Sequence, residues 1–227
     1  MRDMQKQNIL LTVDIVVFTV IQGDLKILLI KRKYDPYKGK YAIPGGFVKN
    51  EEPLHVAALR ELSEETGVHD VYLKKLTAYG DPKRDPRGRV VTIVYMVLVD
   101  AEKYRLSATT DSAAAEWVNA HDLPSLAFDH QMIVTNALKD LRYEIQTTNI
   151  ASQMLPDLFT LTELQKTYES ILGVELDKRN FRKRIAALDI LKPTRETKME
   201  GAHRPALLYK FKDEKYKPLK EKIHVIV

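Results

Sequence analysis

The N-terminal part of the chain consists mainly of apolar stretches separated by turn residues, a pattern typical of paired β-strands. Residues 10–22 are largely apolar and β-branched, and predict a buried strand. Gly23 and Asp24 predict a turn, after which residues 25–32 continue as the hairpin partner. Further strands are predicted at residues 71–79, 90–100 and 115–118.

Two helices accompany these strands. Gly45 and Gly46 predict a tight turn before a helix at residues 53–66, and Asp129 is placed to cap a helix at residues 130–145. Because sheet and helix alternate along this part of the chain, the pattern predicts an α/β/α sandwich.

The last third has a different pattern. The polar segment that ends at Pro156 predicts a linker at residues 148–156. It would join one domain at residues 1–147 to a second at residues 157–227. Thr160 and Glu163 form a capping box for a helix ending at Gly173. Further along, Asp177 predicts the start of a helix at about 178–188, followed by strands at 190–193 and 206–211. Helix, turn, helix and a two-stranded hairpin indicate a winged helix, although other small α+β modules share this order.

Composition narrows the class of protein. The chain has 227 residues, 44% of them hydrophobic and 30% charged, as in ordinary globular proteins. It has no cysteine, which excludes disulfides and zinc–thiolate sites. No apolar run approaches the roughly 18 residues of a membrane span, and the first residues lack a secretory signal. We therefore expect a cytoplasmic protein that does not enter a membrane.

Positive charge is concentrated towards the C-terminus. From Asn149 onward there are 16 Lys and Arg against 11 Asp and Glu, which accounts for the whole net charge of +5. Such an asymmetry predicts a C-terminal module that binds a polyanion. The alternative is a basic tail that only aids solubility.

Three carboxylates lie close together on the helix predicted at residues 53–66. At 100° per residue, Glu61, Glu64 and Glu65 fall within an arc of about 100° on one helix face. Because like charges at this spacing repel, they suggest a bound cation that prefers oxygen ligands, Mg²⁺ or Mn²⁺. The alternative for the triplet alone is a solvated acidic face.

The residues around this triplet resemble the Nudix box of pyrophosphate hydrolases. The segment reads Gly46, five residues, Glu52, seven residues, Arg60-Glu61-Leu62, one residue, Glu64-Glu65, one residue, Gly67-Val68. No defining position departs from the box. The resemblance implies a sandwich with a mixed sheet, and a cation bound by Glu61, Glu64, Glu65 and the Gly46 carbonyl.

The same segment suggests roles for two further residues of the catalytic set. Arg60 lies four residues before Glu64 and is placed to hold it by an ion pair, while Glu52 is placed to hold Arg60 in turn. The general base varies in position among such enzymes and is left unassigned.

Other residues are candidates for binding a ligand. Arg32 ends a predicted strand, and the loop at residues 83–89 has four cations in seven residues, typical of a phosphate or ribose clamp but also of a solvated turn. Before the helix at 130–145, Asp129 and its neighbours are candidates too, or serve only to cap and pack. The predicted ligand-binding residues are Arg32, Arg84, Asp85, Arg87, Arg89, Phe128 and His130.

The helix predicted at residues 178–188 is a candidate for DNA binding. Residues 178–184 contain five cations, and Phe181 and Ile185 supply an apolar stripe that leaves the cations outside. Lys and Arg hold phosphates, and Arg and Asn read base edges. The alternative is a charged surface helix without a ligand. The predicted DNA-binding residues are Lys178, Arg179, Asn180, Arg182, Lys183 and Arg184, with Lys198, His203 and Arg204 from the wing.

Together the two halves resemble Nudix-related transcriptional regulators, which control NAD biosynthesis or sugar catabolism genes in bacteria. Supporting stretches are residues 34–48, Arg84-Asp-Pro-Arg-Gly, Ala127-Phe-Asp-His130 and Asn180-Phe-Arg-Lys-Arg184. The resemblance implies a homodimer that binds double-stranded operator DNA and senses ADP-ribose or a similar nucleotide or nucleotide sugar. Many such regulators have a decayed Nudix box, whereas here every acid is present, so hydrolysis is also predicted.

Two alternatives remain open from the sequence. In one, the chain is chiefly a Mg²⁺-dependent Nudix pyrophosphohydrolase of the ADP-ribose type, whose C-terminal module aids dimerisation or localisation. In the other, it is a non-catalytic repressor that senses a sugar, which would leave the placed carboxylates without a use.

Overall fold

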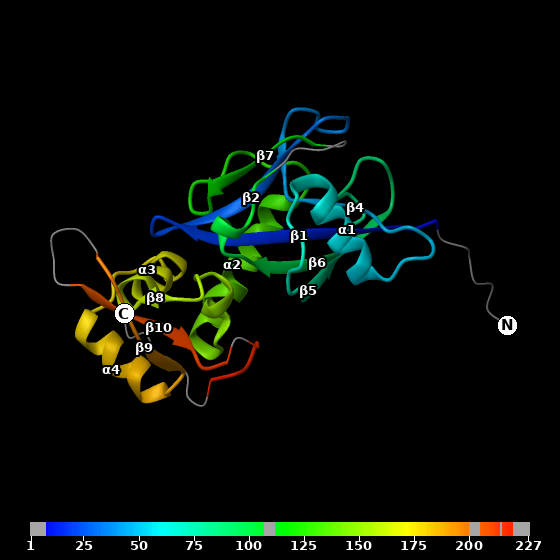
Figure 1. The fold of residues 1–227 in the computed structure, drawn as a ribbon. Helices are drawn as coiled ribbons and strands as arrows, with labels where there is room; N and C mark the ends of the chain where they lie inside the picture. The colour runs from blue at the N-terminus through cyan, green and yellow to red at the C-terminus, as the bar shows by residue number, and fades with distance from the viewer. Residues whose placement is uncertain (1–7, 107–111, 200–204, 214, 220–227) are drawn as a thin grey trace. The chain divides into compact units, whose positions relative to one another are not determined.

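The computed structural model describes residues 8–106, 112–199, 205–213 and 215–219 (Figure 1). Its contacts divide the chain into two compact units. The first holds the residues up to Val17, Ile27–Val97 and Tyr104–Ala137. The second holds Phe18–Lys26, Leu98–Lys103 and the chain from Leu138 onward. This division by contacts differs from the domain boundaries proposed at residues 147 and 157, which stay a prediction.

A seven-stranded sheet forms the framework around the Nudix segment. Strands β3, β2, β1, β6 and β5 lie in that order, with β4 also paired to β1 and β7 to β2. The central strand β1 is buried almost continuously from Val13 to Phe18, because both faces of the sheet are covered. The strands are β1 Leu10–Ile21, β2 Asp24–Arg32, β3 Tyr41–Ala42, β4 Gly45–Phe47, β5 Lys74–Tyr79, β6 Val90–Leu98 and β7 Ser112–Asn119.

Helix α1 (Leu54–Thr66) carries the Nudix segment and packs against β4 and β7. Ala57, Ala58 and Leu62 form its buried face. The helix ends at Gly67, which adopts the left-handed conformation at φ 78° and donates its N–H to the Ser63 carbonyl. A residue with a side chain would be strained at that position, so the glycine fixes where the helix stops.

Gly45 and Gly46 lie in strand β4, not in the predicted turn. They pair antiparallel with Asp14 and Val13 of β1. A Cβ at position 45 would lie 2.3 Å from the Val13 carbonyl oxygen, so only glycine lets the two backbones approach this closely.

The second unit contains the predicted helix-turn-helix and hairpin. Thr160 and Glu163 form the predicted capping box of α3, Gly173 ends that helix, and Asp177 caps α4. A three-stranded sheet in the order β8-β10-β9 completes the module. Its elements are β8 Phe159–Thr160, α3 Leu161–Leu172, α4 Lys178–Leu188, β9 Leu191–Lys198 and β10 Ala206–Phe211.

Two elements join the sheet to this module along the chain. Helix α2 (His130–Thr147) runs from the first unit into the second, and the 3₁₀ helix η2 (Ile150–Gln153) follows it; a 3₁₀ turn η1 (Ala101–Lys103) occurs earlier. None of the helices among the described residues is long and apolar enough to cross a membrane.

The predicted linker at residues 148–156 is packed over much of its length. Thr148, Asn149, Ile150 and Ala151 are all buried. The Asn149 side-chain amide donates to the carbonyls of residues 213 and 215, and its oxygen accepts from the N–H of residue 217. This segment therefore lacks the exposure expected of a flexible linker, because its polar groups bond to the chain that follows the wing.

Candidate functional site

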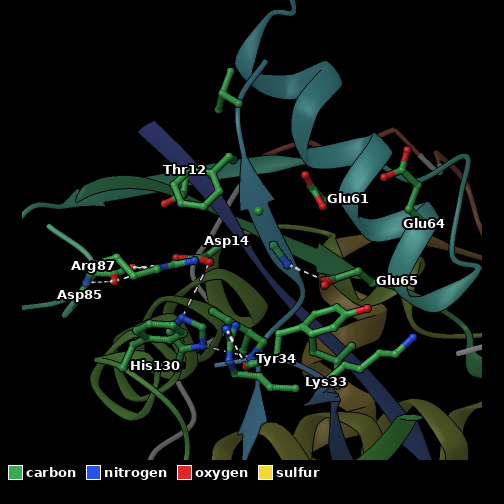
Figure 2. Close-up of a pocket in the computed structure, with 18 of the residues that line it drawn as sticks. Thr12, Asp14, Lys33, Tyr34, Glu61, Glu64, Glu65, Asp85, Arg87 and His130 are labelled. Carbon is green, nitrogen blue, oxygen red and sulfur yellow. Dashed lines mark hydrogen bonds and ion pairs between the residues drawn. The ribbon is translucent and has the colours of Figure 1, made fainter. Parts of the chain in front are cut away.

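A pocket of about 560 Å³ opens beside α1 and the adjoining strands (Figure 2). One wall is acidic and comes from α1, with Glu61, Glu64 and Glu65. The facing wall holds cations and aromatic rings from the end of β2, the loop at residues 81–89 and the residues just before α2. The predicted carboxylates and most of the predicted ligand-binding residues thus share one pocket.

The acidic wall is organised by Arg60. Its Nε and Nη2 donate to the two oxygens of Glu52 at 3.0 and 2.6 Å. Its Nη1 donates to Glu61 at 2.6 Å and to Glu64 at 3.2 Å. Both contacts expected of Arg60 are present, together with one to Glu61. Glu65 is buried and accepts from the Gly45 N–H at 2.8 Å, which fixes it against β4.

These contacts shift the protonation of the carboxylates in opposite directions. Hydrogen bonds from Arg60, and then from the Lys49 N–H, lower the pKa of Glu52 to about 2. Burial raises the pKa of Glu61, although its bond to Arg60 works in the other direction. The Arg60 guanidinium therefore offsets only part of the cost of burying the Glu61 charge.

The donor set suits a hard divalent cation. Carboxylates and the Gly46 carbonyl supply only oxygen, which Mg²⁺ and Mn²⁺ prefer. A Cβ at Gly46 would lie 2.5 Å from the Glu61 carboxylate, so the glycine keeps the strand backbone close to that group. In the described part of the chain, however, no three His, Cys, Asp or Glu side chains converge as a metal cluster. Arg60 bonds two of the carboxylates, so a bound cation would compete with its Nη1.

A buried ion cluster supports the facing wall. Arg84 donates from Nε and Nη2 to Asp129 at 2.9 and 2.8 Å, and from Nη2 to Asp14 at 3.3 Å. Burial acts to lower the pKa of Arg84, but Asp129 and Asp14 outweigh it and raise that pKa. The neighbouring Asp85 binds Arg87 through both carboxylate oxygens at 2.7 to 3.2 Å. Arg84 thus anchors the loop, and Asp85 orients Arg87.

Arginine and aromatic side chains alternate along this wall. The Arg87 guanidinium lies 4.9 Å from the centre of the Phe47 ring and 5.5 Å from that of Phe128. Arg32 lies 4.8 Å from Phe128, and Tyr37 meets the same ring edge-on at 4.8 Å. Burial and the nearby charge of Arg87 lower the pKa of Arg32. Such an arrangement is suited to an anionic, partly planar ligand.

His130 is buried at the start of α2. Its Nδ1 accepts from the Ile43 N–H at 3.2 Å, and its Nε2 lies 3.8 Å from Asp14. Burial lowers its pKa, although Asp14 acts to raise it. His130 therefore packs and bonds to the backbone while still lining the pocket. Phe128, two residues earlier, adopts a left-handed φ of 52°.

Some predicted residues lie elsewhere, and others were missed. Arg89 does not line the pocket; its Nη1 donates to the Gly80 carbonyl and closes the loop. Asp129, considered as a helix cap, uses its carboxylate for Arg84. Among the missed residues, only Asp14 had a signal, as a lone acid inside an apolar strand. Further lining residues that the pattern did not single out are Thr12, Lys33, Tyr34, Asp35, Phe47 and Lys49.

Helix α4 exposes four of its five cations, and DNA binding by them stays a prediction. Phe181 and Ile185 are buried, whereas Arg184 is half-buried. Lys198 is exposed on β9, where it forms an ion pair with Glu163 at 2.6 Å. His203 and Arg204 lie outside the described residues. The exposed polar side chains of α4 are Lys178, Arg179, Asn180, Arg182 and Lys183.

Comparison with known families matches both halves of the chain. The family model of the NUDIX domain matches residues 10–138. The model described as the NrtR DNA-binding winged helix domain matches residues 151–211. The chain belongs to the NrtR group of Nudix proteins. The predicted Nudix sandwich with a mixed sheet, followed by a winged helix, is confirmed.

Relatives extend over both domains. The ADPR responsive transcriptional repressor NtrR of Acinetobacter baylyi is 40% identical, over 91% of this chain and 84% of its own length. The crystal structure of Shewanella oneidensis NrtR complexed with a 27mer DNA superposes with a TM-score of 0.79 at 34% identity, covering 89% of this chain and 93% of that one.

Other relatives match only the Nudix part. The NUDIX domain of the Shewanella protein, complexed with ADP ribose, covers 60% of this chain and 90% of its own, with a TM-score of 0.55 and 34% identity. The ADP-ribose pyrophosphatase of Methanocaldococcus jannaschii is 41% identical, over 61% of this chain and 80% of its own length.

Proposed function

We propose that this protein is a transcriptional repressor that binds DNA through α4 and responds to ADP-ribose bound in the pocket beside α1. The exposed face of α4 carries this proposal, because it presents Arg179, Asn180 and Arg182 on a module that matches the NrtR DNA-binding domain. A helix with these side chains fits the major groove, where Arg and Asn read bases and Lys holds phosphates. The relative from Acinetobacter supports repression as the outcome.

The pocket supports ADP-ribose as the effector. One of its walls is acidic, and the other carries arginines and the rings of Phe47 and Phe128. A planar base can stack on these rings, while a cation held by the carboxylates can bind the diphosphate. Arg32 and Arg87 provide cations that can bond phosphate or ribose oxygens. Two relatives that bind or respond to ADP-ribose match this part of the chain.

Hydrolysis of ADP-ribose is a second candidate activity of the same pocket. It is favoured because Glu61, Glu64 and Glu65 are all present on α1, and because an ADP-ribose pyrophosphatase is 41% identical over the Nudix part. Mg²⁺ or Mn²⁺ bound by these carboxylates and the Gly46 carbonyl would neutralise phosphate oxygens and acidify a water. Arg60 would then position Glu64, while Glu52 holds Arg60.

The repressor function also bears on the oligomeric state and on the two alternative functions. A homodimer in the cytoplasm is proposed, because a two-fold operator is read by two copies of α4. A hydrolase without a regulatory role leaves the exposed cations of α4 unexplained. A sugar sensor leaves Glu61, Glu64 and Glu65 without a use.

DNA binding tests the repressor. Replacing Arg179 and Arg182 with Ala should weaken binding to duplex DNA and reduce the slope of log affinity against log salt by about 2. The matched control replaces two exposed lysines outside the winged helix, Lys75 and Lys139, with Gln. Equal slopes for the Arg variant and the wild type would reject α4 as the reader.

Turnover of ADP-ribose with Mg²⁺ or Mn²⁺ tests the hydrolase. Glu64→Gln with Glu65→Gln should abolish phosphate-coupled hydrolysis and leave DNA binding intact, whereas Glu175→Gln on an exposed loop should change neither. Turnover that persists in the double variant would reject the metal assignment. No turnover in the wild type, with ADP-ribose still bound, would mean that the box serves sensing alone.

A further inference from the structure

A second hollow, distinct from the pocket beside α1, lies at the base of the hairpin formed by β9 and β10. It has a volume of about 540 Å³ and is lined by Lys192, Lys210, Phe211, Lys212, Asp213 and Lys215. We call it the wing-base hollow. Four of the six described residues that line it are lysines, and none of the six belongs to α4 or to the predicted wing contacts.

Two of these lysines face each other directly. Lys192 of β9 and Lys210 of β10 are cross-strand partners in the antiparallel register, so their side chains leave the same face of the hairpin. Both are exposed. The next pair along, Leu191 and Phe211, points to the opposite face, where Phe211 packs on Phe159. Like charges in this position destabilise a strand pair, so the hairpin keeps an unfavourable contact.

Among the described residues, the carboxylates near this pair are bonded to other groups. Asp213 is bonded by the Lys217 ammonium and by the Lys215 N–H. Asp189 forms an ion pair with Lys212 at 2.6 Å. Within the described residues, the side chains of Lys192 and Lys210 have neither an ion pair nor a hydrogen bond. Within the described part of the chain, the hollow therefore has unpaired positive charge, while Asp213 and Asp189 are already engaged.

We infer that the wing-base hollow binds a phosphate of the DNA backbone and adds ionic contacts to those made by α4. This inference rests on the proposed function, since it requires the winged helix to bind duplex DNA. Ammonium groups at the ends of flexible side chains act as point charges that suit phosphate oxygens and carry no sequence information. A phosphate between Lys192 and Lys210 also offsets the repulsion between the two ammonium groups, and this relief makes the free energy of binding more favourable.

The experiment measures how a double variant, Lys192→Gln plus Lys210→Gln, binds a random-sequence duplex about three helical turns long, and compares it with the wild type. Each phosphate contact that is lost should lower the slope of log affinity against log salt by about 0.9, so we expect a decrease of about 0.9 for each bound protomer. Without DNA, the unfolding midpoint should stay the same or rise, because a repulsive pair is removed. A structural role for the lysines would lower it instead.

The controls separate this inference from the proposed function. The Lys75→Gln and Lys139→Gln protein removes the same charge elsewhere and should retain the wild-type slope. An unchanged slope for the hollow variant, with a reduced slope for the Arg179 and Arg182 variant, overturns the wing-base contact alone. Absence of DNA binding by the wild type overturns the proposed function.

Inorganic phosphate distinguishes DNA from a free anion as the source of the phosphate. Calorimetric titration of phosphate into the wild type and the hollow variant shows whether the lysines hold a small anion. Loss of phosphate binding in the variant without any change in the DNA salt slope would assign the hollow to a free anion and reject the DNA contact.

Discussion

At the scale of single residues, Arg84 is the side chain whose loss should cost most. It is 3% exposed and is shared by Asp14 and Asp129, which are 9% and 14% exposed. Replacing it with Met leaves the buried Asp14 and the half-buried Asp129 without this cation, and breaking a buried pair in this way typically costs about 3–5 kcal/mol. We expect a loss of that size in the free energy of unfolding measured with urea. A loss below about 1 kcal/mol would show that the cluster is dispensable.

A companion variant tests the cause. Adding Asp14→Asn and Asp129→Asn to Arg84→Met removes all three charges, so most of the lost stability should return. The double replacement of the carboxylates alone should stay destabilised, because the buried Arg84 then loses both of its ion-pair partners. If the triple variant is no more stable than Arg84→Met, packing and not charge explains the effect.

Gly46 makes a prediction specific to the pocket. Alanine at this position places a Cβ 2.5 Å from the Glu61 carboxylate and forces that side chain away from β4. We expect the cation-dependent turnover proposed above to fall by at least tenfold, which corresponds to about 1.4 kcal/mol, with little change in the unfolding midpoint. Gly80→Ala, whose Cβ would lie 3.4 Å from Val91, serves as the control. Equal activity of the two variants would contradict the role given to Gly46.

At the scale of elements, the capping box of α3 links helix stability to pH. Burial acts to raise the pKa of Glu163, but the bond to Lys198 and the Thr160 N–H outweigh it and leave that pKa below its ordinary 4.5. The folded state therefore gains stability from this carboxylate above pH 4.5 and loses it as the pH falls through the lowered pKa. Because Gln keeps the cap but not the charge, Glu163→Gln should remove this acid dependence.

The size of the effect follows from the exposure of the pair. Glu163 is 29% exposed and Lys198 53%, so the ion pair contributes about 0.2–1 kcal/mol at neutral pH. Glu163→Ala also loses the hydrogen bond from the Thr160 N–H, which should lower the free energy of unfolding by a further amount of about 0.5–1.5 kcal/mol. Chemical unfolding at pH 7 and pH 4 measures both. A Gln variant with the acid dependence of the wild type would exclude Glu163 as its source.

The same elements show what the sequence could predict. Gly67 marked the end of α1, Thr160 and Gly173 marked both ends of α3, and Asp177 marked the start of α4, because such signals are local and chemically specific. The strand predicted to end at residue 193 extends to Lys198 as β9. The sequence did not show this extension, because residues 195–198 are exposed and lack an apolar alternation. Gly45 and Gly46 were read as a turn because their pairing with β1 is a long-range contact.

The site divides in the same way. Carboxylates at helical spacing placed Glu61, Glu64 and Glu65 on one helix of one pocket wall. The buried bonds of Arg84 to Asp14 and Asp129 were not predicted, because they join β1, a loop and the start of α2 across 70 and 45 residues of sequence. Charge pattern alone cannot separate an arginine that binds a ligand from one that holds a loop.

At the scale of the whole molecule, α2 connects the two units along the chain. His130 at its first residue lines the pocket, and Glu144 near its other end accepts a hydrogen bond from Tyr216 at 2.7 Å. Because one continuous helix belongs to both units, we expect a ligand that favours one state of α2 to change DNA binding by the second unit. For this to happen, the ligand must bind the two states with different affinity.

Coupling of this kind has a reciprocal thermodynamic signature. If ADP-ribose changes the affinity for DNA by a given factor, DNA must change the affinity for ADP-ribose by the same factor, typically about 5- to 150-fold. Glu64→Gln with Glu65→Gln, studied without divalent cation, keeps the effector from being consumed. Calorimetry measures ADP-ribose binding with and without a saturating duplex, and fluorescence anisotropy measures DNA binding with and without ADP-ribose. We expect the two factors to agree within error. Two factors that both equal one would show that the pocket does not control α4, and unequal factors would show that ADP-ribose or DNA binds at a further site outside this cycle.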